Sequence, residues 1–541
     1  MKLECLPFSQ IPHTTRLFVD FLSNDSKIQS FYPRSPYFKS WLRDEAARVG
    51  YDAERREQVC AVLERQNRSW GASPRTIENL ARLRAGASAV VTGQQVGLFG
   101  GPLFSILKSL TAVRLSDEAT KAGIDCVPVF WLATEDHDVA EVSQVSLLGS
   151  DGLPRKFSVT PEGITGAPVG SLVFSDEIGA VVNEAAELLG DAEVGEALRQ
   201  AYRPGETFGS AFAKLFARIF AEWGVILLDG TDPELHRIAK PIYRAALERA
   251  EELDGVLLRR GTALEAAGYH QQVKVTPSST LLFCLESGSR VAVHRRSNGH
   301  AVRGAFLLGK EAVSQAALVK RIDETPQHFS ANALLRPVIQ DYLLPTLAYA
   351  GGAAEVAYFA QAAVIYEALL GRVTPVVPRF SATLIEPKAQ SLLDKYQLRI
   401  SDLFRGPEDL RQHLAQHTLP ADLQTAFHSA EASLEKSLAG IQTELARLDS
   451  TLVNSAAISG SKMRYQLSKL RARAARAELR KTGVIGRHAN FLSNALYPKG
   501  ALQEREVGGI YFLARRGPRL LKDLYEAVNP DCLDHQLISL A

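Results

Sequence analysis

Two stretches of sequence decide the fold: ASAVVTGQQVGLFGGP at 87–102 and CVPVFWLATEDHD at 126–138. The first begins with a short apolar strand, 87–91, and continues into a glycine-rich loop. A helical pattern follows from 103 to about 122, with Pro102 suited to the first helical position. Residues 126–133 are apolar throughout, which is typical of a parallel strand buried on both faces. Together these stretches predict a strand–loop–helix–strand unit that opens an α/β sheet.

The glycine-rich loop is the first candidate for ligand binding. Its glycines allow close backbone approach, and the helix after it presents unpaired N–H groups to an anion. The predicted binding residues are Thr92, Gly93, Gln94, Gln95, Gly97, Gly100, Gly101 and Pro102. The pattern is neither GxGxxG nor a Walker loop, so a purely structural turn is the alternative. Lys108, near the second turn of the helix, is either a further ligand contact or a surface lysine.

The second candidate is the acidic cluster after the second strand: Glu135, Asp136, His137 and Asp138. Neighbouring carboxylates raise one another's pKa, and they favour a protonated imidazole. Such a group can bind an amine, hold a divalent metal or exchange protons with a nucleophile. We predict these four residues as catalytic, and a helix N-cap with a solvated first turn is the alternative. Because ligands bind at the carboxyl ends of parallel strands, both candidates should open onto one crevice.

The α/β pattern continues beyond a first insertion at 143–205. A helix at 208–223, a strand at 225–228 and a helix capped by Asp232 are expected, followed by a β-hairpin pattern at 271–296 in an insertion near 270–300. A strand at 345–350 then meets Gly351-Gly352 and a helix, and a further strand at 373–377 follows. These segments supply further predicted substrate- or nucleotide-binding residues: Tyr349, Gly351, Gly352, Glu355 and Arg379.

Residues 386–483 change in character and predict an antiparallel coiled-coil arm. Apolar residues from Leu423 to Leu452 follow heptad spacing, and the same spacing returns at Met463 after an expected break at 455–460. The second helix is strongly basic, which indicates a solvated face or a patch for a nucleotide or partner. The segment 484–541 is expected to return to the core, and its polar residues Asn490, Gln503, Glu504 and Arg505 form a possible second polar site.

Composition narrows the class of protein. The chain has 541 residues, 46% of them hydrophobic and 23% charged, which excludes disordered, collagen-like and disulfide-scaffold proteins. A formal net charge of +2 gives no global reason to bind nucleic acid or a membrane surface. Five cysteines without paired spacing indicate a reducing compartment and give no zinc signature. No apolar run is long enough for a signal peptide or a membrane span, so we expect a cytoplasmic protein. The predicted units are 1–142, 143–205, 206–385, 386–483 and 484–541.

Several segments in order along the chain resemble the bacillithiol-biosynthesis cysteine-adding enzyme family, BshC. They are VTGQQVGLFGGPLF at 91–104, PVFWLATEDHDVAEV at 128–142, GETFGSAFAKLF at 205–216, LLDGTDPELHRIAKPIY at 227–243, RPVIQDYLLPTLAYAGGAAEVAYFAQ at 336–361 and LQER at 502–505. One departure is Ala353, where the family usually has proline after the paired glycines.

The resemblance implies a Rossmann-like core related to class I synthetases, two connecting insertions, and a coiled-coil arm used for homodimerisation. It also implies a ligase that joins cysteine to glucosaminyl-malate in the last step of bacillithiol synthesis. ATP is the expected co-substrate, with Mg2+ as a further candidate, although the chain has no HIGH motif and no KMSKS loop. The alternatives are a nucleotidyltransferase with another acceptor and a non-catalytic nucleotide-binding scaffold.

Overall fold

A five-stranded parallel sheet forms the centre of the computed structural model, which describes residues 2–296, 305–416 and 421–540. Its strands, in spatial order, are β13 (Val376–Pro378), β12 (Thr346–Gly351), β2 (Ser88–Gln94), β3 (Cys126–Leu132) and β6 (Ile226–Asp229). All neighbouring pairs are parallel. The chain order reverses between β2 and β12, which is the doubly wound arrangement with its switch point at that pair. The predicted Rossmann-like α/β core is confirmed.

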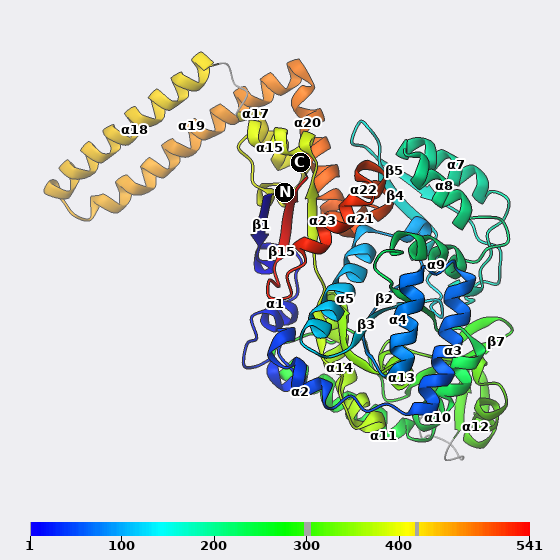
Figure 1. The fold of residues 1–541 in the computed structure, drawn as a ribbon. Coiled ribbons are helices and arrows are strands. Elements are labelled where there is room, and N and C mark those ends of the chain that lie inside the picture. The colour runs from blue at the N-terminus through cyan, green and yellow to red at the C-terminus, as the bar shows by residue number, and fades with distance from the viewer. Residues whose placement is uncertain (1, 297–304, 417–420, 541) are drawn as a thin grey trace.

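Both faces of this sheet are buried, as the apolar run at 126–133 predicted. Along β3, Phe130 and Leu132 pack into one hydrophobic cluster, whereas Val129 and Trp131 pack into another. The first face carries α5 (Leu103–Lys121) and α9 (Phe208–Ile219). The second carries α3 (Ala53–Ser69), α4 (Pro74–Ala85), α10 (Pro233–Glu248), α11 (Ala250–Ala266), α13 (Arg336–Leu343) and α14 (Ala353–Leu370) (Figure 1).

The first strand is longer than predicted. Residues 92–94, which we expected in the loop, continue β2 because they pair with Phe130, Trp131 and Leu132 of β3. Gly93 permits this pairing: a Cβ there would lie 2.8 Å from the Trp131 carbonyl oxygen. The extension carries Gln94 to the carboxyl edge of the sheet.

The two insertions differ in size. The first contains the hairpin β4 (Gln144–Leu148) and β5 (Pro154–Ser158), followed by α7 (Ile178–Leu189) and α8 (Ala192–Ala201). The hairpin predicted within 271–296 is present as β7 (Ser279–Glu286) and β8 (Ser289–Arg295). It belongs to a five-stranded antiparallel sheet with β9 (Ala305–Leu308), β10 (Glu311–Ser314) and β11 (Phe329–Ala331), and α12 (Gln315–Glu324) lies beside it. Residues 297–300 of the predicted insertion lie outside the described residues.

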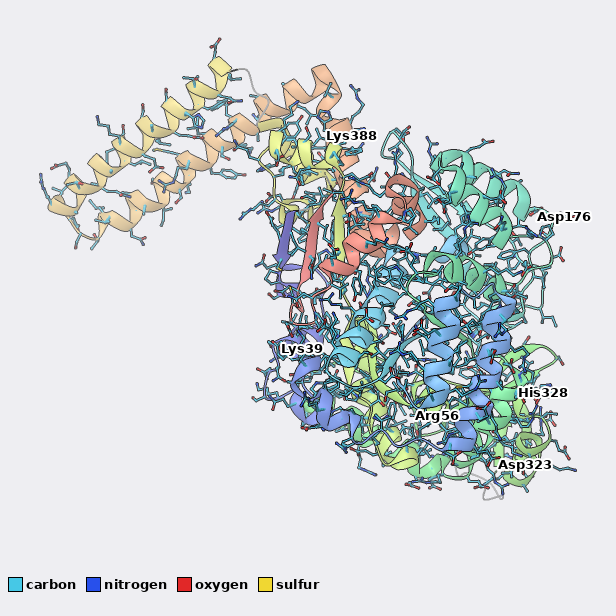
Figure 2. All side chains as sticks on the ribbon, in the orientation of Figure 1. Lys39, Arg56, Asp176, Asp323, His328 and Lys388 are labelled. Atoms are coloured by element: carbon cyan, nitrogen blue, oxygen red, sulfur yellow. The ribbon has the colours of Figure 1, made fainter. Side chains whose placement is uncertain are left out.

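The arm is an antiparallel helical hairpin of α18 (Ala421–Leu448) and α19 (Leu452–Thr482) that extends away from the body (Figures 1 and 2). The expected break at 455–460 is wrong, because those residues lie inside α19. The reversal occurs at 449–451, where the Asp449 carboxylate accepts hydrogen bonds from the backbone and hydroxyl of Thr451. Gly460 stays helical and leaves room for Leu438 of the opposite helix.

The two ends of the chain meet in a second sheet, in the order β1 (Lys2–Leu6), β15 (His535–Ser539) and β14 (Ala382–Ile385). The C-terminal segment thus returns to the body, as predicted. Shorter helices complete the N-terminal part: α1 (Arg16–Leu22), α2 (Leu42–Ala46) and α6 (Val139–Val142). The C-terminal part has α15 (Pro387–Lys395), α16 (Ile400–Leu403), α17 (Pro407–Gln416), α20 (Val484–Leu496), α21 (Gln503–Glu506), α22 (Gly509–Arg516) and α23 (Arg519–Ala527).

One helix among the described residues, α14, is long and apolar enough to match a membrane span by length and composition. Half of that window is buried within the protein, and α14 packs against α11 and α13. Its apolar character is explained by its place in the core.

Candidate active site

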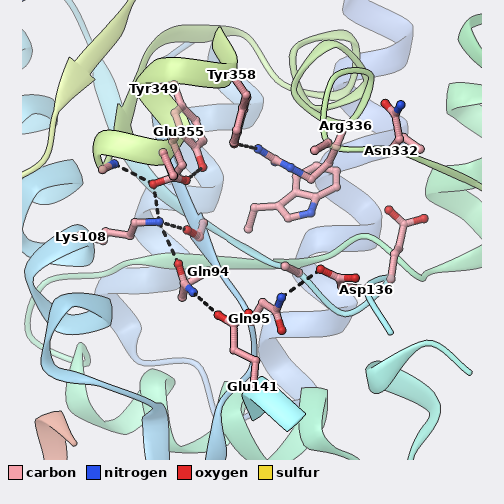
Figure 3. A pocket seen from close by; sticks show the side chains of 18 of the residues that line it. Gln94, Gln95, Lys108, Asp136, Glu141, Asn332, Arg336, Tyr349, Glu355 and Tyr358 are labelled. Atoms are coloured by element: carbon pink, nitrogen blue, oxygen red, sulfur yellow. Dashed lines mark hydrogen bonds and ion pairs between the residues drawn. The ribbon is translucent and has the colours of Figure 1, made fainter. Parts of the chain in front are cut away.

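A cavity of about 560 Å3 opens at the carboxyl edge of the parallel sheet, beside the switch point between β2 and β12. The ends of four parallel strands and one insertion contribute to its wall (Figure 3). Its charged and hydrogen-bonding side chains are those of Gln94, Gln95, Lys108, Trp131, Glu135, Asp136, His137, Glu141, Arg290, Asn332, Arg336, Tyr349, Glu355, Tyr358, Arg379 and Arg505.

The structure brings the two predicted clusters together. The Gln95 Nε2 atom donates a hydrogen bond to Asp136 Oδ2 at 2.9 Å, and Gln94 Nε2 reaches Glu141 Oε1 at 3.4 Å (Figure 3). Residues from the end of β2 and from the segment after β3 therefore face the same cavity. This is the convergence that the positions of the strands predicted.

A buried ion pair joins the first crossover helix to the second half of the sheet. The Lys108 ammonium lies 2.6 Å from Glu355 Oε2, and it also donates to the Gly93 carbonyl at 2.6 Å and to Gln94 Oε1 at 3.0 Å. Glu355 further accepts hydrogen bonds from Gly352 N–H and the Tyr349 hydroxyl. Burial opposes ionisation of Glu355, but Lys108 and the Gly352 N–H outweigh it and lower its pKa. Lys108 is thus a buried structural cation and not a surface lysine.

Glu135 is a buried carboxyl group with an unsatisfied oxygen. Its Oε1 makes no hydrogen bond within the described residues, and His236 Nε2 lies 3.5 Å from it. Burial raises the pKa of Glu135 to about 7, and the nearby Asp229 adds to the effect while Arg290 opposes it. A carboxyl group with a pKa near neutrality can accept a proton from a substrate under physiological conditions.

His236 is a buried histidine next to Glu135. Burial lowers the pKa of His236 to about 4, so its imidazole is neutral at physiological pH. Its Nδ1 lies 3.1 Å from the Tyr243 hydroxyl, and both side chains are buried on α10. His236 and Tyr243 both lie in the segment 227–243 that resembles the family. Nothing in the sequence pattern, however, indicated that they lie next to the acidic cluster.

Arg290, from β8 of the second insertion, is the main contributor that the sequence did not predict. Its Nη1 lies 3.3 Å from His137 Nδ1 and 3.6 Å from Asp136 Oδ1. A guanidinium group only donates hydrogen bonds, so the first contact requires a lone pair on Nδ1. Arg290 therefore places a positive charge beside the Asp136 carboxylate. The segment that contains β8 was predicted only as a β-hairpin, so the sequence did not indicate that Arg290 reaches the cavity.

Arg336 is a second unpredicted cation, at the start of α13. Its Nη2 donates to the Tyr358 hydroxyl at 3.0 Å, and its guanidinium carbon lies 5.6 Å from the Tyr349 ring centre and 5.9 Å from that of Trp131. Aromatic faces of this kind stabilise a cation that has lost its water. The arginine is therefore fixed in position at the cavity wall.

The remaining two arginines differ in their pairing. Arg379 binds Glu504 through both terminal nitrogens, at 2.6 and 3.1 Å, so its charge is neutralised. The Arg505 guanidinium makes no hydrogen bond or ion pair with the described residues, and its central carbon lies 6.0 Å from the Phe104 ring centre. It is an exposed cation at the cavity, available to an anionic ligand.

The loop after β2 does not line the cavity beyond Gln95. Gly100 has a φ of 85°, and its N–H donates to the Tyr202 hydroxyl at 3.1 Å. At the start of α5, the Leu103 N–H donates to the Val507 carbonyl at 2.9 Å, so the C-terminal segment covers this helix end. Buried helix N-termini need such acceptors. The Leu103 N–H is therefore not free for an anion, and Gly97, Gly100, Gly101 and Pro102 do not line the cavity, so their predicted role in ligand binding stays a prediction.

Three other predicted residues have structural contacts. Asp138 caps α6, since its carboxylate accepts the Glu141 N–H at 3.1 Å, and it does not line the cavity. This matches the N-cap alternative, and the catalytic role of Asp138 stays a prediction. The Thr92 hydroxyl is buried and donates to the Ala350 carbonyl, which joins β2 to β12. Gly351 belongs to β12 and is not part of the cavity wall.

The possible second polar site is not a single site. Gln503 binds the Leu384 backbone and Glu504 binds Arg379, so both are buried links between α21 and the strands beside it. Asn490 accepts a hydrogen bond from Arg411 beside the base of the arm. Only Arg505 reaches the cavity. The reason is that the first two residues of α21, Gln503 and Glu504, are buried, whereas Arg505 is exposed.

No three His, Cys, Asp or Glu side chains gather as a metal site in the part of the chain that the structure describes. Divalent cations such as Mg2+ commonly keep several waters and bind substrate phosphates. The cationic wall, in contrast, fits phosphate or carboxylate groups. The residues present therefore fit an anionic co-substrate better than a metal held by the protein alone.

Comparison with known proteins identifies the family. Residues 1–380 match a family model described as "Bacillithiol biosynthesis BshC, N-terminal Rossmann-like domain", and residues 382–540 match "Bacillithiol biosynthesis BshC, C-terminal coiled-coil domain". A relative from Koribacter versatilis named "Putative cysteine ligase BshC" is 50% identical over 99% of both chains. Relatives with the same name from Solibacter usitatus and Salinibacter ruber are 36% and 34% identical, over 99% and 97% of this chain and 100% and 96% of theirs. Together with the doubly wound core and the helical arm, these matches show that the chain belongs to the BshC family.

Proposed function

We propose that this protein is a cytoplasmic ligase that joins the carboxyl group of cysteine to the amine of glucosaminyl-malate, the last step of bacillithiol synthesis. The observation that carries the proposal is a single cavity lined both by carboxyl groups, among them Glu135 and Asp136, and by arginines, among them Arg336 and Arg505. Its relatives are named as cysteine ligases, which supports the same reaction class for this chain. ATP is the proposed co-substrate.

The chemistry requires activation of the carboxyl group. An amine does not displace oxide from a carboxylate at a useful rate, so the cysteine carboxyl must first gain a better leaving group. ATP supplies one as an acyl phosphate or adenylate, and Mg2+ would enter with its phosphates. Arg505 and Arg336 lie where they can bind the negative charges of such groups or of the malate moiety.

The amine must lose a proton as it attacks. Glu135 can accept that proton, because its pKa of about 7 leaves a useful fraction ionised and its Oε1 makes no hydrogen bond in the described part of the chain. Asp136 and His137, held by Gln95 and Arg290, are placed to orient the amino sugar. This division of roles follows from burial: the buried carboxyl exchanges the proton and the exposed pair binds.

The decisive experiment incubates the purified chain with ATP, cysteine and glucosaminyl-malate and follows bacillithiol by mass spectrometry. We expect product with wild-type protein and a loss of about 100-fold or more with Glu135→Gln. Pyrophosphate exchange into ATP that depends on cysteine would indicate an adenylate. Nucleotide binding without turnover would favour the scaffold alternative, and transfer to another acceptor would favour the nucleotidyltransferase.

We also propose a homodimer formed through the arm. Ile441, Met463 and Leu470 are each more than half exposed, although they belong to the heptad pattern. A two-helix hairpin buries one stripe, with Phe427 and Leu438 inside, and leaves the rest for a second copy. Sedimentation should show a dimer for wild type and a monomer for Ile441→Glu/Leu470→Glu; an unchanged mass for the variant would refute this arrangement.

A further inference from the structure

A pair of thiols lies where the two ends of the chain meet. Cys5 is on β1 and Cys532 precedes β15, and their Sγ atoms are 3.3 Å apart. Sulfur atoms in a disulfide are about 2 Å apart, so bond formation requires a movement of roughly 1 Å. In the reduced state, either thiol can donate a hydrogen bond to the other.

The surrounding structure fixes this approach. In the antiparallel pairing of β1 and β15, Cys5 lies opposite Gln536. The turn that carries Cys532 is closed by its N–H bond to the Asn529 carbonyl, and Lys39 binds the adjacent Asp531 at 2.8 Å. Figure 2 labels Lys39 on the left side of the body, below the sheet that contains β1 and β15. Folding has already brought together two residues separated by 527 positions, so little further entropy is lost when the sulfurs join.

Accessibility separates this pair from the other thiols. Cys5 is exposed and Cys532 is partly exposed, whereas Cys60, Cys126 and Cys284 are buried with at most 1% of their surface exposed. A small oxidant in solvent therefore meets Cys5 and Cys532 first.

We propose that Cys5 and Cys532 are a modification site that forms an intramolecular disulfide by exchange with a low-molecular-weight disulfide. One cysteine, as its thiolate, attacks a sulfur of the small disulfide, which forms a mixed disulfide and releases one small thiolate. The second cysteine loses its proton to solvent and attacks the protein sulfur of the mixed disulfide, which releases the second small thiolate. Two protein thiols are thereby oxidised, and the small disulfide is reduced to two thiols after the released thiolates take up the protons.

The disulfide would covalently link two parts of the sheet of β1, β15 and β14, which lies next to one wall of the cavity. His535, three residues after Cys532, contacts the Ser381 hydroxyl at 2.7 Å. Ser381 donates to Glu504, which in turn holds Arg379 at the cavity. A covalent link between β1 and the start of β15 therefore restrains the strand on which this hydrogen-bonded chain depends.

The test uses the full reduced chain and glutathione disulfide as the probe, and its readout is independent of ligase activity. Partial loss of water around the Cys5 thiol and its contact with Cys532 raise the pKa of Cys5 to about 11, so the exchange is followed at about pH 8.5, where more thiolate is present than at neutral pH. We expect an intact mass lower by two hydrogens and one cross-linked peptide pair containing Cys5 and Cys532. Persistent glutathione adducts on wild type without that cross-link, or no reaction, would overturn the proposal.

Two matched variants sharpen the result. Cys5→Ser and Cys532→Ser should each keep a single glutathione adduct on the remaining cysteine, because no second thiol is available to displace it. Hydrogen exchange in β1 and β15 should slow on oxidation of wild type, by on the order of tenfold, and stay unchanged in Cys532→Ser. Equal exchange in oxidised and reduced wild type would show that the bond does not fasten the two ends.

Discussion

The Lys108 ammonium lies 2.6 Å from the Glu355 carboxylate, although the two residues belong to different halves of the sheet. Lys108 lies on α5, the helix that follows β2. Glu355 lies in the first turn of α14, the helix that follows β12. The ion pair therefore bridges the switch point of the fold and forms part of the cavity wall. Removing either charge leaves the other buried without its partner.

We predict that Lys108→Met lowers the free energy of unfolding by about 3–5 kcal/mol, because Glu355 loses its counter-ion in a buried site. The double variant Lys108→Met/Glu355→Gln should recover a substantial part of that loss. Urea denaturation of both single variants and the double variant gives the coupling energy. Additive losses would mean that the two charges do not stabilise each other.

The pKa of Glu135 predicts a pH dependence of turnover. The ionised form accepts the proton, so kcat/KM should rise about tenfold per pH unit below pH 7 and level off above it. Glu135→Gln should remove this dependence together with most of the activity. A wild-type profile that is flat between pH 5.5 and 8.5 would assign the proton transfer to another group.

The same group predicts a pH dependence of stability. A raised carboxyl pKa means that the folded chain binds a proton more tightly than the unfolded chain between about pH 4.5 and 7. The contribution of Glu135 to stability is thus complete below that window and is lost as pH rises through it. Glu135→Gln should be more stable than wild type at pH 8, by about 3 kcal/mol, and nearly equal to it at pH 4.5. A constant difference between the two proteins at both pH values would contradict the shift.

Two nearby carboxylates provide a matched comparison. Asp136 accepts the Gln95 amide and lies beside Arg290 in the cavity, whereas Asp138 only caps α6. Asp136→Ala should reduce kcat/KM by about 100-fold. Asp138→Ala should cost about 1 kcal/mol of stability and change turnover less than threefold. Steady-state kinetics with thermal melts distinguishes these effects, and equal kinetic losses would restore Asp138 to the reaction.

Arg505 and Arg379 give a second matched pair. Arg505→Ala should raise the KM for an anionic substrate by about tenfold and leave the free energy of unfolding within about 0.5 kcal/mol, since its guanidinium makes no hydrogen bond or ion pair with the described residues. Arg379→Ala should lower that free energy by about 3–5 kcal/mol, because Glu504 is completely buried. The reverse pattern would mean that Arg379 is the cation that binds substrate.

Much of the core could be predicted because its signals are local. The apolar run at 126–133 reflects burial on both faces of β3, and Asp232 and Pro233 mark a helix start that the structure confirms. The convergence of Gln95 and Asp136 also followed from sequence, because carboxyl ends of parallel strands share one edge. The predicted position of the arm's turn is wrong because a glycine such as Gly460 usually interrupts a helix. In the structure, Gly460 stays helical because a larger side chain there would crowd Leu438 of the opposite helix.

The rest of the site depends on contacts between distant segments. Arg290 reaches His137 from an insertion 153 positions away, and Val507 covers the helix end that the glycine loop seemed to leave open. Periodicity describes which face of an element is buried, but it does not say which other element covers that face.

By itself, the sequence determined the alternation of strands and helices, the edge at which ligands gather and the family. Only the tertiary structure decided which charges are paired, which carboxyl is buried and which helix end is covered. The physical reason is that local backbone preference and apolar periodicity are properties of neighbouring residues. Proton affinity and free charge, in contrast, depend on the distance to groups that only the folded chain brings near.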